Sequence, residues 1–146
     1  MLGSNGERML AAALPHVDAW NTWFSSYGNS ASGFAALNSR IDAACERAGR
    51  DPATLHRSLM TPLVVGEDEA GLRRSAERVG ARFGRDAETV LERYGALGPV
   101  GTIDQVVVRL KEIEEIGYER VMLQHLPHDD LETVALIGRE LAPAVA

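Results

Sequence analysis

The sequence is short of several residue types, and each shortage excludes a class of protein. It has a single cysteine, Cys45, which cannot form a disulfide within the chain, so a reducing compartment is expected. Cys45 lies in a helical stretch and is interpreted as a small buried hydrophobe. No apolar run approaches the roughly 20 residues needed to cross a bilayer, and the first residues do not resemble a secretion signal. A cytoplasmic protein is therefore predicted.

Positive charge is also scarce. Lys and Arg total 15 against 21 Asp and Glu, which gives a formal net charge of -6, and there is no dense basic run. Nucleic acids and anionic membranes attract basic surfaces, so neither is expected as a partner. The chain is 45% hydrophobic and 25% charged, which is ordinary for a folded protein. Its 146 residues fit a single domain over residues 1–146.

The sequence alternates short apolar runs with longer helical stretches, which is typical of β/α units. The predicted strands are a stub at residues 1–2 and the segments 17–21, 59–65 and 120–125. Pro62 weakens the third strand, because proline donates no hydrogen bond to a sheet. The predicted helices are 7–14, 34–48, 69–83, 87–94, 103–116 and 130–141, and long loops are predicted at 22–32 and 95–101.

Capping signals set most of the predicted helix starts. Asp68 and Asp86 each precede a helical stretch, and Thr102 with Gln105 three residues later has the pattern of a capping box. Asp129, with a glutamate three residues later, is predicted to cap the last helix.

Five pieces of the sequence, the first made of two segments, resemble the luciferase-like monooxygenase family in the right order. Residues 3–8 (Gly-Ser-Asn-Gly-Glu-Arg) and 17–21 (Val-Asp-Ala-Trp-Asn) are similar to its Gly-rich turn and the strand that follows. Residues 49–52, 64–70, 101–110 and 121–124 are similar to segments around its last two strands. The resemblance implies an α/β fold, the C-terminal half of a (β/α)8 TIM barrel with about four β/α units.

The family implies a flavin- or deazaflavin-dependent oxidoreductase, acting as a monooxygenase or by hydride transfer. Coenzyme F-420 is the expected cofactor and FMN the alternative, with a small-molecule substrate that the sequence does not identify. The chain departs from the family in having Ser4 as the second residue of the Gly-rich turn and Leu-Pro-His at 14–16. The units before the fifth strand, which build much of the ring pocket, are not in this chain, so a truncated domain without activity of its own is expected.

The resemblance assigns the phosphate end of the cofactor to the Gly-rich turn. Glycine permits positive φ and close backbone approach, and a helix start offers free N–H groups to an anion. An ordinary strand-to-helix turn is the alternative interpretation. Asn21, at the end of a strand, is expected to contact the cofactor, whereas Trp20 is expected mainly in the core. The predicted cofactor-binding residues are Gly3, Ser4, Asn5, Gly6, Arg8 and Asn21.

Two polar residues follow the last predicted strand. Gln124 and His125 are predicted to contact substrate or cofactor there. His125 and His128 lie beside two carboxylates, but Pro127 separates them and a zinc site needs further ligands in defined geometry, so no metal is expected.

A second hypothesis is a non-catalytic half-barrel binding or assembly module with a vestigial cofactor site. Four units cannot close an eight-stranded barrel, so the outer strands near Leu2 and Met122 are expected to have free edges. Uncovered inward faces are expected at Trp20, Leu63, Val65 and Leu123. A homodimer that pairs edge to edge is predicted, with a terminal segment folded over the open face as the competing arrangement.

Overall fold

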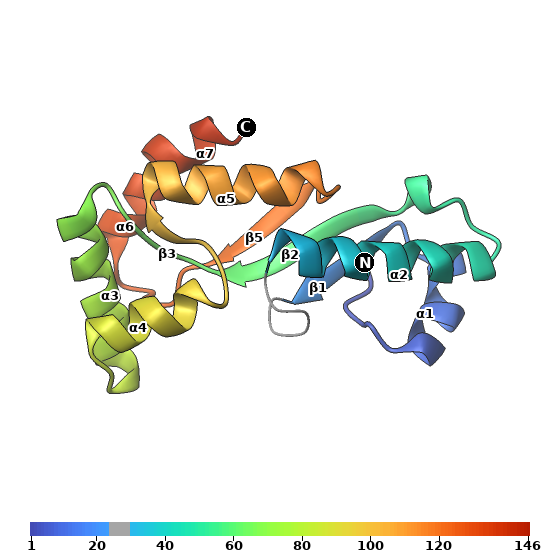
Figure 1. The fold of residues 1–146 in the computed structure, drawn as a ribbon, viewed down its shortest axis with the longest axis horizontal. Helices are drawn as coiled ribbons and strands as arrows, with labels where there is room; N and C mark the ends of the chain where they lie inside the picture. Colours follow the sequence, from blue (N-terminus) through green and yellow to red (C-terminus); the bar gives the residue numbers. More distant parts are fainter. Residues whose placement is uncertain (24–29) are drawn as a thin grey trace. The chain divides into compact units, whose positions relative to one another are not determined.

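The computed structural model describes residues 1–23 and 30–146, which divide into two compact units. Unit 1 comprises Met1–Met60 and Ile113–Met122, and unit 2 comprises Thr61–Glu112 and Leu123–Ala146. A single domain over residues 1–146 stays a prediction. In chain order the elements shown in Figure 1 are α1 (Glu7–Ala13), η1 (Leu14–His16), β1 (Ala19–Trp23), α2 (Ala31–Arg47), η3 (Pro52–Thr54), β2 (His56–Pro62), β3 (Val64–Gly66), α3 (Glu69–Phe83), α4 (Ala87–Gly95), β4 (Val100–Thr102), α5 (Ile103–Glu115), β5 (Arg120–Gln124), α6 (Leu131–Leu136), η4 (Ile137–Leu141) and α7 (Ala142–Ala144).

The strands of the larger sheet follow one another in chain order. Leu2 forms a parallel bridge with Trp20, β1 pairs in parallel with β2, and the strand order continues to β5. Consecutive β/α units produce this arrangement, so the predicted strand stub and its three successors are present. The strand predicted at 17–21 is shifted to Ala19–Trp23. Of the loop predicted at 22–32, residues 24–29 lie outside the described residues.

The core of unit 1 lies between β1 and α2. Trp20 is fully buried, and its ring lies 6.4 Å from that of Tyr118, which in turn meets Phe34 of α2 edge-on at 5.7 Å. Cys45, on the same helix, is also fully buried, and burial raises the pKa of its thiol. Aromatic rings bury large areas and prefer these tilted and edge-on contacts, so this cluster fixes α2 against the sheet.

The expectation that inward faces are uncovered is wrong for three of the four residues. Trp20 and Leu63 are fully buried and Val65 is 1% exposed within the single chain, while Leu123 is half-buried. Successive side chains of a strand point to opposite faces of the sheet, and Trp20 points toward the helices rather than into the barrel. Composition alone does not reveal which face a given residue takes.

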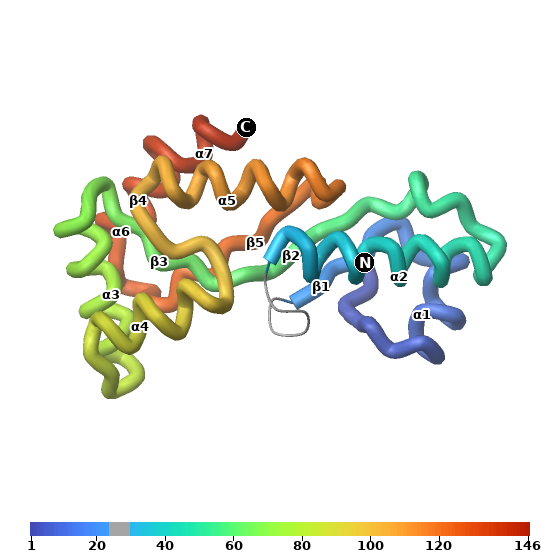
Figure 2. Tube along the Cα trace, in the orientation of Figure 1, coloured from blue at the N-terminus to red at the C-terminus, as the bar shows by residue number. Residues whose placement is uncertain are grey.

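A second, two-stranded sheet lies in unit 2. β3 pairs in parallel with β4, labelled in Figure 2, so that Val64 lies opposite Val100. The single strand predicted at 59–65 is two strands, because β2 ends at Pro62 and the chain then pairs with β4. The loop predicted at 95–101 includes most of β4, whose three residues are too few to produce a periodic pattern.

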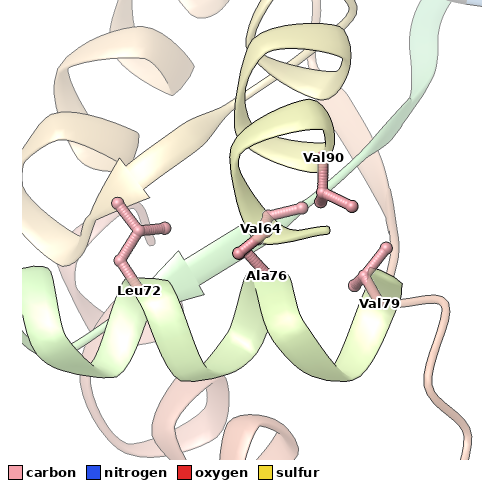
Figure 3. Close-up of a cluster of buried hydrophobic side chains, with 6 residues drawn as sticks. Val64, Leu72, Ala76, Val79 and Val90 are labelled. Carbon is pink, nitrogen blue, oxygen red and sulfur yellow. The ribbon is translucent and has the colours of Figure 1, made fainter. Parts of the chain in front are cut away.

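The core of unit 2 joins α3 and α4 to β3. Figure 3 shows the apolar side chains that meet there, which are Val64, Leu72, Ala76, Val79, Ala87 and Val90. Burying each of the larger ones contributes roughly 1.5–3 kcal/mol. Gly66 brings β3 against α3, since a Cβ there would lie 2.0 Å from the Leu72 nitrogen. No side chain fits this contact.

Three of the predicted caps are present and one is wrong. Asp68 and Asp86 accept hydrogen bonds from the third residue after each, and the Gln105 side chain accepts from the Thr102 nitrogen at 2.9 Å, as in one half of a capping box. Asp130, and not Asp129, caps the last helical segment, because its carboxylate accepts from the Thr133 nitrogen at 3.1 Å. That segment continues from α6 through the π-helical η4 to α7.

Within the described part of the chain, none of the helices combines the length and apolar character that a membrane span requires.

Candidate cofactor-binding site

The predicted phosphate-binding turn is a loop pinned to β1 and α2 by three hydrogen bonds. Trp20 Nε1 donates to the Ser4 carbonyl at 3.0 Å, and Arg40 Nη2 donates to the Asn5 carbonyl at 2.9 Å. Asn5 Nδ2 donates to Thr22 Oγ1 at 3.4 Å. These contacts hold residues 3–6 beside Trp20 and Thr22, near the C-terminal end of β1. In an α/β barrel, ligands bind at this end of the strands.

The two glycines of the turn face open space. A Cβ on Gly3 would meet no atom within 4 Å, and one on Gly6 would meet only Ser4 Oγ at 3.8 Å. Gly6 has φ -77 and ψ 131, in the extended region, and Gly3 is not among the glycines with positive φ in the described chain. Neither glycine therefore has the positive φ that glycine permits. What glycine provides here is room for a ligand to approach the backbone.

The start of α1 supplies free donors next to this open space. Gly6 is the N-cap, and no side chain caps the helix, so the first N–H groups of α1 have no intrahelical partner. Ser4 Oγ lies 3.3 Å from the Gly6 nitrogen and is the only side chain bonded to it among the described residues. Arg8 is exposed on α1. Because α1 has only seven residues and begins with Glu7, its backbone donors and Arg8 matter more here than its dipole.

Asn21 lies on the opposite face of β1 from Trp20. It is in register with Ser58 of β2, and Ser58 Oγ donates to Asn21 Oδ1 at 2.9 Å. This bond fixes the orientation of the Asn21 amide and leaves its nitrogen as the group able to donate to a ligand.

Asn5 has a buried Oδ1 without a hydrogen-bond partner among the described residues. A buried unsatisfied acceptor costs free energy, so a donor from a ligand or a water would be favourable at this position.

The other two predicted contact residues, Gln124 and His125, belong to unit 2. Gln124 ends β5, and its carbonyl accepts from the Leu63 nitrogen at 3.1 Å. His125 Nε2 is buried, 3.8 Å from Asp130 Oδ2, and burial lowers the pKa of its ring although Asp130 opposes that shift. The described residues contain no cluster of three potential metal ligands.

Sequence reasoning missed Thr22, Arg40 and Ser58. Thr22 lies two residues after Trp20, on the same face of β1, so the strand pattern was a usable signal. Arg40 contacts Asn5 across 35 positions of sequence, and no local pattern indicates such a pair.

The fold is similar to those of known oxidoreductases, although the sequence alone matches no family. No protein-family model matches the chain, and no curated protein matches it either. The coenzyme F-420-dependent tetrahydromethanopterin reductase from Methanopyrus kandleri superposes with a TM-score of 0.67 at 19% identity, over 99% of this chain and 50% of that one.

Two further solved structures are similar. An F-420-dependent secondary alcohol dehydrogenase in complex with an F-420–acetone adduct gives a TM-score of 0.66 at 15% identity, over 99% of this chain and 48% of that one. The oxygenating constituent of 3,6-diketocamphane monooxygenase from Pseudomonas putida, in complex with FMN, gives a TM-score of 0.61 at 16% identity. The match covers 99% of this chain and 48% of that one.

The chain thus spans about half the length of these proteins. They are luciferase-like monooxygenase family members with TIM-barrel folds. The chain therefore has an α/β fold with parallel strands that matches about half of each of these TIM-barrel proteins, as expected for the half of a (β/α)8 barrel that its sequence predicted.

Proposed function

We propose that this chain contributes the cofactor phosphate-binding loop of a luciferase-like oxidoreductase that uses a flavin or deazaflavin. The observation that carries the proposal is the loop at residues 3–6. It is pinned by Trp20 and Arg40, and its two glycines leave open space beside the uncapped start of α1. The similar proteins that bind F-420 or FMN support the cofactor class.

Each residue of the proposed site has a distinct part in holding the cofactor. The first N–H groups of α1 donate to phosphate oxygens, Ser4 adds a hydroxyl, and Arg8 adds positive charge. Asn5 and Asn21 offer side-chain amides from the loop and from β1. The cofactor supplies the redox chemistry, and the protein binds and orients it. F-420 is the expected cofactor and FMN the alternative, for hydride transfer or oxygenation respectively.

Turnover is expected to need more of a barrel than this chain provides, because the similar proteins are about twice as long. Gln124 and His125 are proposed as contacts to the substrate or cofactor in such a context. A cytoplasmic location stays a prediction from the single cysteine.

We also propose that two copies of the chain associate. The strand order from Leu2 to β5 accounts for four neighbouring strands, and a (β/α)8 barrel needs eight. Trp23, on the same face of β1 as Asn21, is 49% exposed. If the Leu2 edge of one copy pairs with the β5 edge of the other about a two-fold axis, the backbone N–H and C=O groups of both edges gain hydrogen-bond partners. Light scattering after size exclusion tests this, and a folded monomer near 15.8 kDa at micromolar concentration would contradict it.

The cofactor proposal is tested by Gly6→Val. Gly6 has extended backbone angles that valine readily adopts, and the space around its Cβ is open, so the variant should fold normally. Its branched side chain fills the space assigned to the phosphate. Losing one or more charge-assisted hydrogen bonds should weaken F-420 or FMN binding by about tenfold or more.

The control is Gly95→Val, which adds the same side chain at the end of α4, where a Cβ also meets nothing within 4 Å. Dissociation constants measured by cofactor fluorescence should be unchanged in this control. Equal affinities for the wild type and Gly6→Val would reject the loop assignment. Dimer formation without any cofactor binding would instead favour the non-catalytic assembly module.

A further inference from the structure

A polar groove lies in unit 2, whereas the cofactor loop belongs to unit 1. It has a volume of about 430 Å3 and lies between α3 and the segment formed by α6 and η4, near the end of β3. Three arginines line it: Arg74 and Arg78 from α3, and Arg139 from η4.

One of these arginines is bound to two carboxylates. Arg78 donates to Asp130 through Nη1 and to Glu132 through Nη2, both at 2.6 Å. Glu132 also lines the groove, and the single positive charge of Arg78 is shared between its carboxylate and that of Asp130, so these three side chains carry a formal net charge of -1. The Arg78 ion pairs therefore fix the groove wall. The two arginines left to bind an anion are Arg74 and Arg139.

Arg74 has no ion pair or hydrogen bond among residues 1–23 and 30–146. Arg139 has only its sequence neighbour Glu140, 3.4 Å away, and its side chain is 63% exposed. Of the acidic residues lining the groove, Glu67 is the one without an arginine partner in the described chain. The groove thus has two guanidinium groups outside the Arg78 cluster, beside the carboxylate of Glu67.

The wall beside Arg74 is open because of a glycine. A Cβ on Gly71 would lie 3.6 Å from Arg74 Nη2 and 3.2 Å from Asp68 Oδ1. With no side chain at this position, the guanidinium of Arg74 can be reached from within the groove. Guanidinium groups bind oxyanions through paired N–H donors in a planar fork, and phosphate offers enough acceptor oxygens for two such forks.

We propose that this groove binds the phosphate group of a small molecule through Arg74 and Arg139. Its residues belong to unit 2, whereas those of the proposed cofactor loop belong to unit 1. It is independent of the proposed oxidoreductase function, and either proposal can fail without the other.

The test uses the whole chain and inorganic phosphate as the probe. Amide chemical shifts are followed by 15N NMR as phosphate replaces chloride at constant ionic strength. Saturable shifts are expected at groove residues such as Gly66, Gly71 and Ala135. The double variant Arg74→Gln with Arg139→Gln should weaken phosphate binding by about tenfold or more.

Arg73→Gln is the matched control. It removes one positive charge, as Arg74→Gln alone does, from the adjacent position of α3, where Arg73 lies within 4 Å of Glu77 and Glu88 and does not line the groove. Phosphate binding should be unchanged in this control. The proposal is overturned if the wild type shows no saturable shifts in the groove, or if the control weakens binding as much as the double variant. Arg74→Lys should retain part of the affinity, because it keeps the charge without the fork.

Discussion

Asp130 is the residue on which the packing of the last helical segment in unit 2 depends most. Its side chain is 3% exposed, and its carboxylate accepts from Arg78 Nη1 at 2.6 Å, from the Thr133 nitrogen at 3.1 Å and from Thr133 Oγ1 at 2.8 Å. Replacing Asp130 with alanine removes both the helix cap and the arginine contact. Loss of an N-cap costs about 1 kcal/mol. Loss of a hydrogen bond to a charged group costs about 1.5–3 kcal/mol.

We therefore expect Asp130→Ala to lower the free energy of unfolding by about 3 kcal/mol. Asp130→Asn should cost less, because asparagine is itself a good N-cap. Glu132→Gln provides a control on the same arginine. Glu132 binds Arg78 at an equal 2.6 Å, but its side chain is 83% exposed, so its loss should cost no more than about 1 kcal/mol.

The contribution of Asp130 to the free energy of unfolding should also depend on pH. Burial alone raises the pKa of the Asp130 carboxyl, but hydrogen bonds from Arg78 and Thr133 outweigh it and hold the pKa below its usual value. A lowered pKa stabilises the folded state above the unfolded pKa of about 4, and this stability is lost as the pH falls through the folded value. Urea denaturation followed by circular dichroism should show a large difference between wild type and Asp130→Asn at pH 7, and a smaller one near pH 3. Equal costs for Asp130→Ala and Glu132→Gln would refute the reasoning.

Two further predictions concern unit 2. Gly80→Ala should destabilise the protein by about 1 kcal/mol or more despite the better helix propensity of alanine, because its Cβ would lie 2.3 Å from the Arg85 carbonyl oxygen. Gly138→Ala, where nothing lies within 4 Å, should instead stabilise it, and urea midpoints that shift in the same direction would contradict this. Because burial lowers the pKa of His125, protonation should destabilise the folded state as the pH falls through about 6.5. His125→Gln should therefore lose less stability than the wild type between about pH 7.5 and 5.5, and identical pH profiles for the two proteins would count against that assignment.

Local chemistry made the helix boundaries the most predictable part of the fold. Asp68 and Asp86 begin α3 and α4 where the sequence predicts, because capping depends on residues three positions apart. The same rule placed the last cap at Asp129, one residue before the observed cap at Asp130. Asp130 also accepts a hydrogen bond from Arg78, which lies 52 positions away in the sequence. No local sequence pattern indicates a contact over that separation.

The strands were harder to predict where pairing depends on distant segments. Pro62 weakened the strand at 59–65, but only the pairing of Val64 with Val100 shows that the chain changes sheets there. The Gly-rich turn was found from its composition, whereas its backbone conformation and the contacts that hold it were not. Its glycines are not needed for positive φ, and the bonds from Trp20 and Arg40 that hold it come from β1 and α2.

The most direct test of the proposed function is to locate a bound cofactor on the protein. The 15N spectrum of the labelled chain is recorded while F-420, or FMN in a parallel experiment, is added to saturation. The largest shifts are predicted at the amides of Gly3, Ser4, Asn5, Gly6 and Arg8, together with the side-chain amide of Asn21. If saturating cofactor leaves these signals unchanged, or moves only signals elsewhere in the chain, the assignment of the cofactor loop is contradicted.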